Sequence, residues 1–566
     1  MTKRIYTVAD ALIDTLLKHG ITTMFGYPGG AILPFYDALP HHPKLRHILV
    51  RNEQGAAFAA QGWARSTGRI GVCVATSGPG GTNLVTGIAD AFMDSIPMLA
   101  LTGQVPLEMI GKDMFQETDM TGVTLNITKH NYLLERAKDI VPMVTEAIYI
   151  ATHGRPGPVH IDLPKDIMAQ EHPRDFELPK VSFHSAHPAM TAFDRIPKQT
   201  LDEVISMLNS AKRPVLLLGH GVKLAGADHL ADQLVRHLKI PTVSTLLGKG
   251  ILGLDNPYHY GMLGMHGFYH ANRAMHEADL IFNIGSRFDD RIVGRYDAFG
   301  KNAKIIHVDI DLAELGKVVT PTLPIHSDAE NFLTQLLERK DLKPLKTEKW
   351  IAQIEQWKSE NEYERRPSEF TVRTALDDLM AVVSKDPDHY ILVTDVGQHQ
   401  MWSSLSCAVK KSFQWLTSGG AGTMGFSLPT GVGAAFAHPE KTIVCITGDG
   451  GIQMNIQELQ VVAEHNLNIK VIIMNNSYLG MVRQWQELFY GHNYSHVNIT
   501  SPNFVKIADA YGLKGARAKN EKEFQKELTH LTKKGPFILE ARVKQEENVF
   551  PMVPGGKTLG ESITRA

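Results

Sequence analysis

The chain has 566 residues and a mass of 62.7 kDa, which is more than one hydrophobic core usually organises, so we expect several domains. Its 58 Lys and Arg residues are balanced by 60 Asp and Glu residues, which leaves no electrostatic basis for binding nucleic acid or an anionic membrane. Because it has no run of about 18 apolar residues, no apolar signal core at its start and only three cysteines without CxxC spacing, we expect a cytoplasmic protein whose partners are small molecules and protein.

Polar stretches divide the chain into segments in which helix and strand patterns alternate. One stretch rich in Pro and His and a second, charged and weakly periodic one have the composition of linkers. Helices that alternate with apolar strands are typical of parallel sheets, so we expect an α/β protein with three doubly wound parallel-sheet domains. The predicted bounds are residues 1–168 for the first domain, 169–197 for a linker, 198–337 for the second domain, 338–369 for another linker, 370–543 for the third domain and 544–566 for a tail.

The first segment is predicted to hold a helix over residues 8–19 and strands over 71–76 and 98–102, and it closes at residues 158–164. Glu53 is its candidate catalytic residue, because this carboxylate starts a helix of small residues behind a predicted strand over 47–50. Taken alone, such a residue is more often a helix N-terminal Glu that the helix dipole favours. A glycine-rich loop over residues 78–83 is by itself only a turn between a strand and a helix.

The second segment is predicted to hold a helix over residues 200–210 and strands over 214–218, 280–285 and 304–309. The tripeptide Gly219-His220-Gly221 follows the first of these strands, as in many nucleotide-binding turns. This signal is weak, and an ordinary tight turn is the more frequent interpretation.

The third segment carries the most informative motif, in which Asp449 and Asn476 each follow a predicted strand, over residues 442–447 and 469–474. A helix predicted over 455–464 lies between the strands and completes a βαβ unit, so both strands end on the same edge of the sheet. Carboxylate and amide oxygens suit Mg²⁺ that is held together with substrate phosphates, and the flanking glycines let main-chain N–H groups approach a diphosphate. Taken alone, Gly448-Asp449-Gly450 is more often a tight turn, and Asn475-Asn476 is more often part of a loop.

The order of Gly448-Asp449-Gly450 and Asn475-Asn476 resembles the cofactor motif of the thiamin diphosphate enzymes. On that resemblance, Asp449, Asn476 and the main-chain oxygen of Tyr478 hold Mg²⁺, and residues 396–399, after a strand over 389–394, bind the diphosphate end. Thiamin chemistry also requires a carboxyl group at N1′ of the aminopyrimidine, because that contact favours the imino tautomer whose N4′ deprotonates C2. Glu53 becomes the candidate for this role.

Further motifs narrow the resemblance to the large catalytic subunits of the acetohydroxyacid synthases, over nearly the whole chain. These motifs lie at residues 27–31, 115–119, 154–158, 287–291, 422–426 and 480–485. The family decarboxylates pyruvate on thiamin diphosphate and condenses the resulting enamine with a second pyruvate or with 2-ketobutyrate. The products are 2-acetolactate and 2-aceto-2-hydroxybutyrate, in branched-chain amino-acid synthesis. The resemblance further implies a homodimer or a dimer of dimers, and a small regulatory subunit on a separate chain.

The resemblance also assigns site residues. The resemblance implies that Met424 bends the thiamin cofactor into a V shape and that the Gly422 carbonyl accepts a hydrogen bond from N4′. The catalytic set is Glu53, Gly30, Gln116 and Lys165, and the cofactor set is Gly397, Gln398, His399, Gly422, Met424, Gly448, Gly450, Gly451, Tyr478, Leu479, Gly480 and Met481. The substrate channel is assigned to Phe115, Met481, Val482 and Trp485, of which the last three share one face of a predicted helix, a pattern that core packing would also produce.

FAD is expected in a structural capacity, because the condensation transfers no net electrons. Catabolic acetolactate synthases, which bind no flavin, lack the segment seen here at residues 287–291. The positions that correspond to FAD contacts are Arg155, Gly219, Gly221, Thr245, Leu246, Met265, His266, Gly285, Arg287, Asp289, Arg291, Asp309 and Asp328.

One position departs from the family, which usually has His before the catalytic Glu, whereas this chain has Asn52. An amide does not titrate near neutral pH, so a proton relay through this position is in doubt. Three other functions remain open: a pyruvate oxidase-like flavoenzyme, a keto-acid decarboxylase and a non-catalytic binding protein. The last is disfavoured, because binding alone does not require a carboxylate that activates C2.

Overall fold

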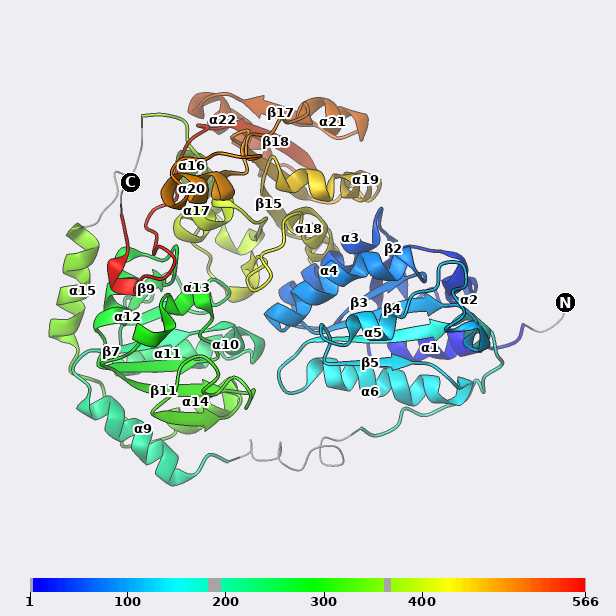
Figure 1. Cartoon of the computed structure of the whole chain (residues 1–566), viewed down its shortest axis with the longest axis horizontal. Helices are drawn as coiled ribbons and strands as arrows, with labels where there is room; N and C mark the ends of the chain where they lie inside the picture. The colour runs from blue at the N-terminus through cyan, green and yellow to red at the C-terminus, as the bar shows by residue number, and fades with distance from the viewer. Residues whose placement is uncertain (1–3, 182–194, 361–367, 565–566) are drawn as a thin grey trace.

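The computed structural model describes residues 4–181, 195–360 and 368–564, which fold into three domains (Figure 1). Each domain is built on a six-stranded sheet, and every strand pair in the three described sheets is parallel. Helices flank the sheets, so the predicted fold class is confirmed. Among the described residues, no helix combines the length and the apolar character that crossing a bilayer requires.

The first sheet has the strand order β2-β1-β3-β4-β6-β5. Its central strands are apolar and buried on both faces, as parallel strands covered by helices must be. The strands are β1 (Thr23–Gly26), β2 (Arg46–Leu49), β3 (Gly71–Ala75), β4 (Met98–Gln104), β5 (His130–Leu133) and β6 (Pro158–Pro164). The helices are α1 (Val8–Lys18), α2 (Leu33–Ala38), α3 (Glu53–Thr67), α4 (Pro79–Asp94), α5 (Met120–Thr124), α6 (Ile140–Thr152) and α7 (Lys165–Met168).

The central sheet has the order β12-β11-β10-β7-β8-β9. Its strands are β7 (Pro214–Leu218), β8 (Thr242–Ser244), β9 (His259–Met262), β10 (Leu280–Ile284), β11 (Lys304–Asp309) and β12 (Leu323–His326). Its helices are α9 (Lys198–Ser210), α10 (His220–Leu224), α11 (Asp228–Leu238), α12 (Tyr269–Glu277), α13 (Asp290–Val293) and α14 (Ala329–Leu337).

Part of the stretch expected to join the second and third domains is a helix, α15 (Glu348–Glu360), that packs on the central domain. Trp350 and Ile354, one turn apart, are buried there, and the Trp350 indole donates to the Pro214 carbonyl over 3.2 Å. The charged residues around these two positions conceal the apolar face in the sequence, because only a single narrow stripe of the helix is buried.

The third sheet has the order β14-β13-β15-β16-β18-β17. Its strands are β13 (Tyr390–Thr394), β14 (Trp415–Leu416), β15 (Thr442–Gly448), β16 (Ile469–Asn475), β17 (Gly515–Ala518) and β18 (Phe537–Arg542). Its helices are α16 (Val372–Val383), α17 (Gln398–Ser406), α18 (Ser427–Ala437), α19 (Leu459–Glu464), α20 (Gly480–Phe489), α21 (Phe504–Ala510) and α22 (Glu521–Glu527). The α-helix expected over 455–464 begins only at Leu459, because two short 3₁₀ turns, η9 (Gly451–Met454) and η10 (Ile456–Glu458), precede it.

The first and third domains share one hydrophobic core through α3 and α18, which lie against each other. Phe58 and Phe426 meet edge to face there, with ring centroids 5.4 Å apart. The helices approach so closely that a Cβ at Gly62 would lie 2.0 Å from the Thr430 carbonyl oxygen, and one at Gly433 would lie 1.9 Å from that of Ala59. Glycine, which has no Cβ, is therefore required at both positions for the two domains to pack.

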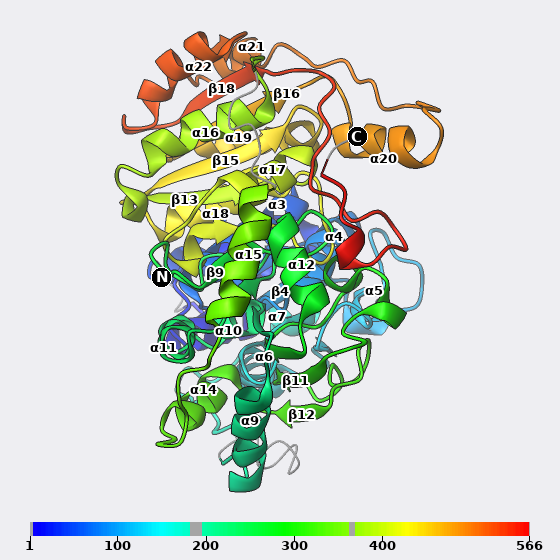
Figure 2. The ribbon, with the colours of Figure 1, turned by 90° about the vertical axis from the view of Figure 1, so that its left-hand side faces the viewer.

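The C-terminal segment connects the third domain to the central one, as the red trace in Figure 2 shows. The Val553 N–H donates to the Met265 carbonyl over 2.7 Å, and the Arg295 N–H donates to the Lys557 carbonyl over 2.9 Å. The short turn η12 (Leu559–Glu561) then packs beside α12. This segment therefore ties the third domain to the central one.

Candidate functional site

Asp449 and Asn476 lie beside each other at one edge of the third sheet, as the βαβ pattern predicts. Strands β15 and β16 are neighbours with Gly448 opposite Met474, so the residue after each strand leaves the same edge. Asp449 is 1% exposed, and its Oδ2 accepts from the Ser501 hydroxyl over 2.6 Å. Burial raises the pKa of this carboxyl group, although the Ser501 hydrogen bond opposes the rise.

The second carboxylate oxygen of Asp449, Oδ1, is buried and has no hydrogen-bond partner among the described residues. A buried carboxylate oxygen without a donor is costly unless a cation approaches it. Among the described residues, no group of three or more His, Cys, Asp or Glu side chains is arranged so that it could hold a metal ion. One carboxylate, one amide and main-chain carbonyls form the oxygen set that Mg²⁺ prefers when phosphates complete its coordination.

Glycine turns surround this edge, where the resemblance places the diphosphate. Gly397 has a φ of 146°, and a Cβ at Gly397 or at Gly448 would lie 3.1 Å from the His399 ring. Burial lowers the pKa of His399 to about 4, so its ring is neutral at pH 7. Its Nε2 is buried without a partner in the described residues. These close main-chain approaches and the unpaired nitrogen fit a polar ligand that contacts the backbone.

A cavity of about 1070 Å³ lies between the domains, and Gly397 lines it, whereas Asp449 and Asn476 do not. Its volume lies just above the usual range for ligand and cofactor sites, about 300–1,000 Å³. Among the residues assigned from the sequence, the lining includes Arg155, Gly221, Thr245, Leu246, Met265, His266, Gly285, Arg287, Asp289, Arg291, Asp309, Asp328, Gly397, Gly422, Met424, Met481, Val482 and Trp485. Gly219 does not line it, because it packs on the main chain of Gly285, where a Cβ would lie 2.1 Å from the carbonyl oxygen.

The polar wall of the cavity is held by ion pairs between the first and central domains and by hydrogen bonds within the central domain. Arg155 pairs with Asp311 at 3.0 Å and with Glu314 at 2.7 Å. Asp309 Oδ1 accepts from the Asp311 N–H over 2.8 Å, and Asp328 caps α14. His266 lines the same cavity with a buried Nδ1 that has no partner among the described residues, and burial lowers its pKa to about 4. An elongated ligand with polar and apolar portions, such as a dinucleotide, fits this lining.

Helix α20 forms the outer wall of the cavity. Met481, Val482 and Trp485 all line it, and Val482 remains 50% exposed, so this apolar face is not sealed in a core. The Arg291 guanidinium lies 5.8 Å from the centre of the Trp485 ring, within the range of a cation–π contact. This arrangement favours a channel wall over the core packing that the sequence pattern left open.

Two assigned residues of the first domain, Glu53 and Gln116, lie at another place, around the glycine turn at Gly78 and Gly80. A Cβ at Gly78 would lie 2.7 Å from the Gln116 carbonyl oxygen, and one at Gly80 would lie 3.4 Å from the Glu53 carboxylate. Glu53 Oε2 accepts from the Asn83 amide over 2.9 Å. Within the described part of the chain, the cavity lining does not include Glu53, Gly30, Gln116, Lys165 or Phe115, and the Phe115 ring is 88% exposed.

Asn52, the residue that departs from the family pattern, has a structural role. It is the N-cap of α3, and its Oδ1 accepts from the Gln54 N–H over 2.9 Å. Asn is among the residues that cap helices best. The amide thus fixes the first turn of the helix that presents Glu53.

Sequence reasoning missed Glu458, a fully buried carboxyl group from η10 that contacts the same helix start. Its Oε1 accepts from the N–H groups of Arg51 over 3.0 Å and Asn52 over 3.1 Å, and burial raises its pKa to about 7. It also missed Asp395, a buried carboxylate whose Oδ1 accepts from the Val396 and Gly425 N–H groups. Nothing local marks either residue, because Arg51, Asn52 and Gly425, which they contact, lie far from them in the chain.

Comparison with known proteins gives consistent results along the chain. Residues 6–123 match the family model of the N-terminal thiamine pyrophosphate binding domain, residues 201–336 that of the central domain and residues 395–541 that of the C-terminal thiamine pyrophosphate binding domain of these enzymes. The acetolactate synthase large subunit of Cyanidium caldarium is 43% identical over 573 residues, covering 99% of this chain and 97% of that protein. That of Lactococcus lactis is 43% identical over 558 residues, covering 98% and 96%. The acetolactate synthase isozyme 1 large subunit of Escherichia coli is 42% identical over 574 residues, covering 99% and 98%.

Proposed function

Because this chain belongs to the acetolactate synthase large subunits of the thiamine pyrophosphate enzyme family, we propose that it joins two 2-keto acids with loss of CO₂, at a site shared by its first and third domains. The donor is pyruvate, and the acceptor is a second pyruvate or 2-ketobutyrate. The observation that carries the residue assignment is the cavity that Gly397, Gly422, Met424 and Trp485 line together.

Bound thiamin diphosphate supplies a carbon acid at C2 that adds to keto-acid carbonyls and accepts the electrons released with CO₂. Asp449, Asn476 and the Tyr478 carbonyl are assigned to Mg²⁺, and the turns at Gly397 and Gly448 to the diphosphate. Glu53 holds a proton at the position of N1′, and Met424 supports the cofactor from the apolar side. The apolar face of α20 excludes water. The activated donor therefore reacts with the acceptor keto acid and is not protonated by solvent.

FAD is assigned to the polar side of the cavity, along Arg287, Asp289, Asp309 and Asp328. The condensation moves no net electrons, so the flavin has a structural role there. The relatives are named large subunits, and a smaller regulatory subunit is proposed as a partner of this chain.

Incubating the protein with pyruvate, Mg²⁺, thiamin diphosphate and FAD tests the proposal, with acetolactate as the expected product. A simple keto-acid decarboxylase would release acetaldehyde instead. A pyruvate oxidase-like enzyme would bleach its flavin when pyruvate is added without oxygen. Either result, without acetolactate, would contradict the proposed function.

The first-domain residues assigned to catalysis, Glu53, Gly30, Gln116 and Lys165, do not line the cavity, which supports a site completed by a second copy of the chain. Glu53 of one subunit would then face the cofactor held by Asp449 of its twofold mate. Mixing Glu53→Gln protein with Asp449→Ala protein is expected to restore activity, because one hybrid site keeps both residues. The measurement is acetolactate formation after subunit exchange. Continued inactivity, when exchange is proven by a mass-labelled subunit, would refute the shared site.

Replacing Trp485 by Leu is expected to change the choice of acceptor more than the rate. The indole is proposed to contact the extra methyl group of 2-ketobutyrate, and one methylene in an apolar pocket is worth about 1–3 kcal/mol. Acetolactate formation from pyruvate should remain largely intact, while the preference for 2-ketobutyrate falls by about tenfold.

Competition between the two keto acids in one reaction measures this preference. Trp357→Leu is the matched control, because Trp357 lies on α15 and does not line the cavity. If Trp485→Leu keeps the wild-type preference for 2-ketobutyrate, or does not fold, Trp485 has a packing role and does not contact the acceptor.

A further inference from the structure

The loop that carries Gly422 and Met424 has little regular structure of its own. It spans residues 417–426, the cofactor loop, between β14 and α18, and forms neither helix nor strand. It contains four glycines, Gly419, Gly420, Gly422 and Gly425, of which the last two have positive φ. Such a backbone is conformationally permissive, so contacts from outside the loop must fix its shape.

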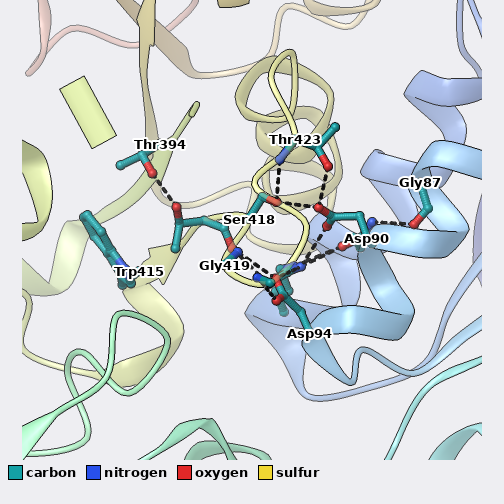
Figure 3. A network of polar contacts seen from close by, with 12 residues as sticks. Gly87, Asp90, Asp94, Thr394, Trp415, Ser418, Gly419 and Thr423 are labelled. Carbon is teal, nitrogen blue, oxygen red and sulfur yellow. Dashed lines mark hydrogen bonds and ion pairs between the residues drawn. The ribbon is translucent and has the colours of Figure 1, made fainter. Parts of the chain in front are cut away.

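Asp94, the last residue of α4 in the first domain, binds the start of this loop. Its Oδ2 accepts from the Gly419 N–H over 3.0 Å, and its Oδ1 accepts from the Gly420 N–H over 2.6 Å. Figure 3 shows this carboxylate facing the loop main chain. One side chain of the first domain therefore fixes two successive peptide groups of the third domain. It supplies the hydrogen-bond acceptors that these backbone N–H groups need.

Asp90, one turn earlier on α4, binds the side chains of the same loop (Figure 3). Its Oδ1 accepts from the Ser418 hydroxyl and, over 2.8 Å, from the Thr423 hydroxyl. Ser418 Oγ in turn accepts from the Thr423 N–H over 2.9 Å, which closes the loop on itself. Two carboxylates of one helix thus hold both ends of the segment 418–423.

Arg65 of α3 balances these charges. Its Nη2 lies 2.7 Å from Asp94 and 3.1 Å from Asp90, its Nη1 donates to the Thr417 carbonyl over 3.0 Å, and all three side chains are at most 2% exposed. Burial opposes ionisation of Asp94, but Arg65 and the two glycine N–H groups outweigh it and keep its pKa low. Burial and the charge of Asp94 raise the pKa of Asp90.

The two borders of the cofactor loop are therefore controlled by different domains. Asp395 of the third domain holds the Gly425 N–H over 2.9 Å and the Ser427 N–H over 3.1 Å. The first domain holds Ser418 to Thr423, and the end of α4 also reaches the cavity through Met93, Asp94 and Ser95. The Ser95 hydroxyl accepts from Arg155 over 2.8 Å, so the same helix end contacts a residue assigned to the flavin.

We propose that Asp94, with Asp90 and Arg65, is a positioning cluster that sets the cofactor loop so that Gly422 and Met424 face the bound thiamin cofactor. The cluster acts through the loop and touches no reacting atom. This inference rests on the proposed function for what the loop contacts, whereas the control of the loop by Asp94 is independent of it. Because the cluster joins two domains, it also transmits any shift between them to the cofactor loop.

Asp94→Asn tests the proposal, because it keeps the size of the side chain but replaces one acceptor by an NH₂ group that faces N–H donors. Two readouts are needed on protein purified with thiamin diphosphate, Mg²⁺ and FAD. Amide hydrogen exchange in residues 418–424 should accelerate tenfold or more, while exchange in α4 remains unchanged. The apparent affinity for thiamin diphosphate should fall about tenfold to hundredfold, as expected when charge-assisted hydrogen bonds are lost.

Asp10→Asn is the matched control. Asp10 is as buried as Asp94 and also pairs with an arginine, Arg4, at 2.8 Å, but it lies on α1 with Thr7 and His42 as its other partners. Loss of this ion pair should lower the melting temperature without changing loop exchange or cofactor affinity. Thr423→Val and Thr423→Ser make a smaller change in the same network. Only the valine variant loses the hydroxyl that donates to Asp90, so amide exchange in residues 418–424 should accelerate in the valine variant and stay at the wild-type rate in the serine variant.

The outcomes separate the positioning role from stability and from the proposed function. If Asp94→Asn only lowers the melting temperature, as Asp10→Asn does, with unchanged loop exchange and cofactor affinity, the positioning role is overturned. If Asp94→Asn does not fold, the Thr423 pair decides, and equal loop exchange in the valine and serine variants overturns it. Failure of the wild-type protein to form acetolactate would refute the proposed function, but the exchange comparison would still test the cluster.

Discussion

Replacing Glu53 by Gln is expected to slow turnover by several orders of magnitude while cofactor binding is kept. A neutral amide cannot share the proton at N1′ that generates the imino form, so the step that activates C2 loses its acid–base partner. The change is conservative in the fold, because the side chain keeps its length and its carbonyl oxygen can still accept from the Asn83 amide. The helix start stays capped by Asn52 and by Glu458.

Steady-state acetolactate formation at saturating thiamin diphosphate, together with the cofactor titration itself, measures this effect. Glu464→Gln is the control, since it neutralises another carboxylate near the same helix start, the one that pairs with Arg51. It should retain activity near that of the wild-type protein. A Glu53→Gln enzyme within tenfold of wild type would remove Glu53 from the catalytic role.

The second large effect is expected from Asp449→Ala, which should lose affinity for thiamin diphosphate. The substitution removes one oxygen ligand of Mg²⁺ and its charge from the edge that binds the diphosphate. It also removes a buried carboxylate whose Oδ1 has no partner among the described residues, so the protein without cofactor is expected to be no less stable.

Thermal unfolding with and without cofactor distinguishes a loss of cofactor binding from a loss of stability. The wild-type melting temperature should rise when thiamin diphosphate and Mg²⁺ are added, because both bind only the folded state. That rise should disappear in Asp449→Ala, and Ser501→Ala, which keeps the carboxylate, should retain it. If the variant melts lower without cofactor and no cofactor concentration restores activity, a folding defect is the better explanation.

Much of the fold followed from local sequence pattern. The segments predicted as strands over residues 214–218 and 304–309 have those bounds in the structure, because Val215 to Leu218 and Ile305, Ile306 and Val308 supply the apolar side chains that a buried parallel strand needs. Helix α15 and the late start of α19 were not foreseen. In both places, contacts with distant elements decide which turns form, and neither charge nor periodicity within the segment reports them.

Part of the candidate site could also be predicted from the sequence, and part could not. Asp449, Asn476 and the glycines beside them could be located from the sequence, because the ends of consecutive parallel strands meet at one edge whatever else the chain does. The resemblance supplied Glu53, Met424 and Trp485, and only the tertiary structure separated Glu53 from the cavity that Met424 and Trp485 line.

What the sequence by itself determined is therefore the set of chemical groups and the sheet edges that present them. Only the tertiary structure decided which carboxylates hold the site in shape. Asp94 meets Gly420 across 326 positions of sequence, and Glu458 meets Asn52 across 406. A buried carboxylate must find donors wherever the packed domains bring them, so its partners are fixed by the approach of α3, α4 and α18, and no local pattern encodes that approach.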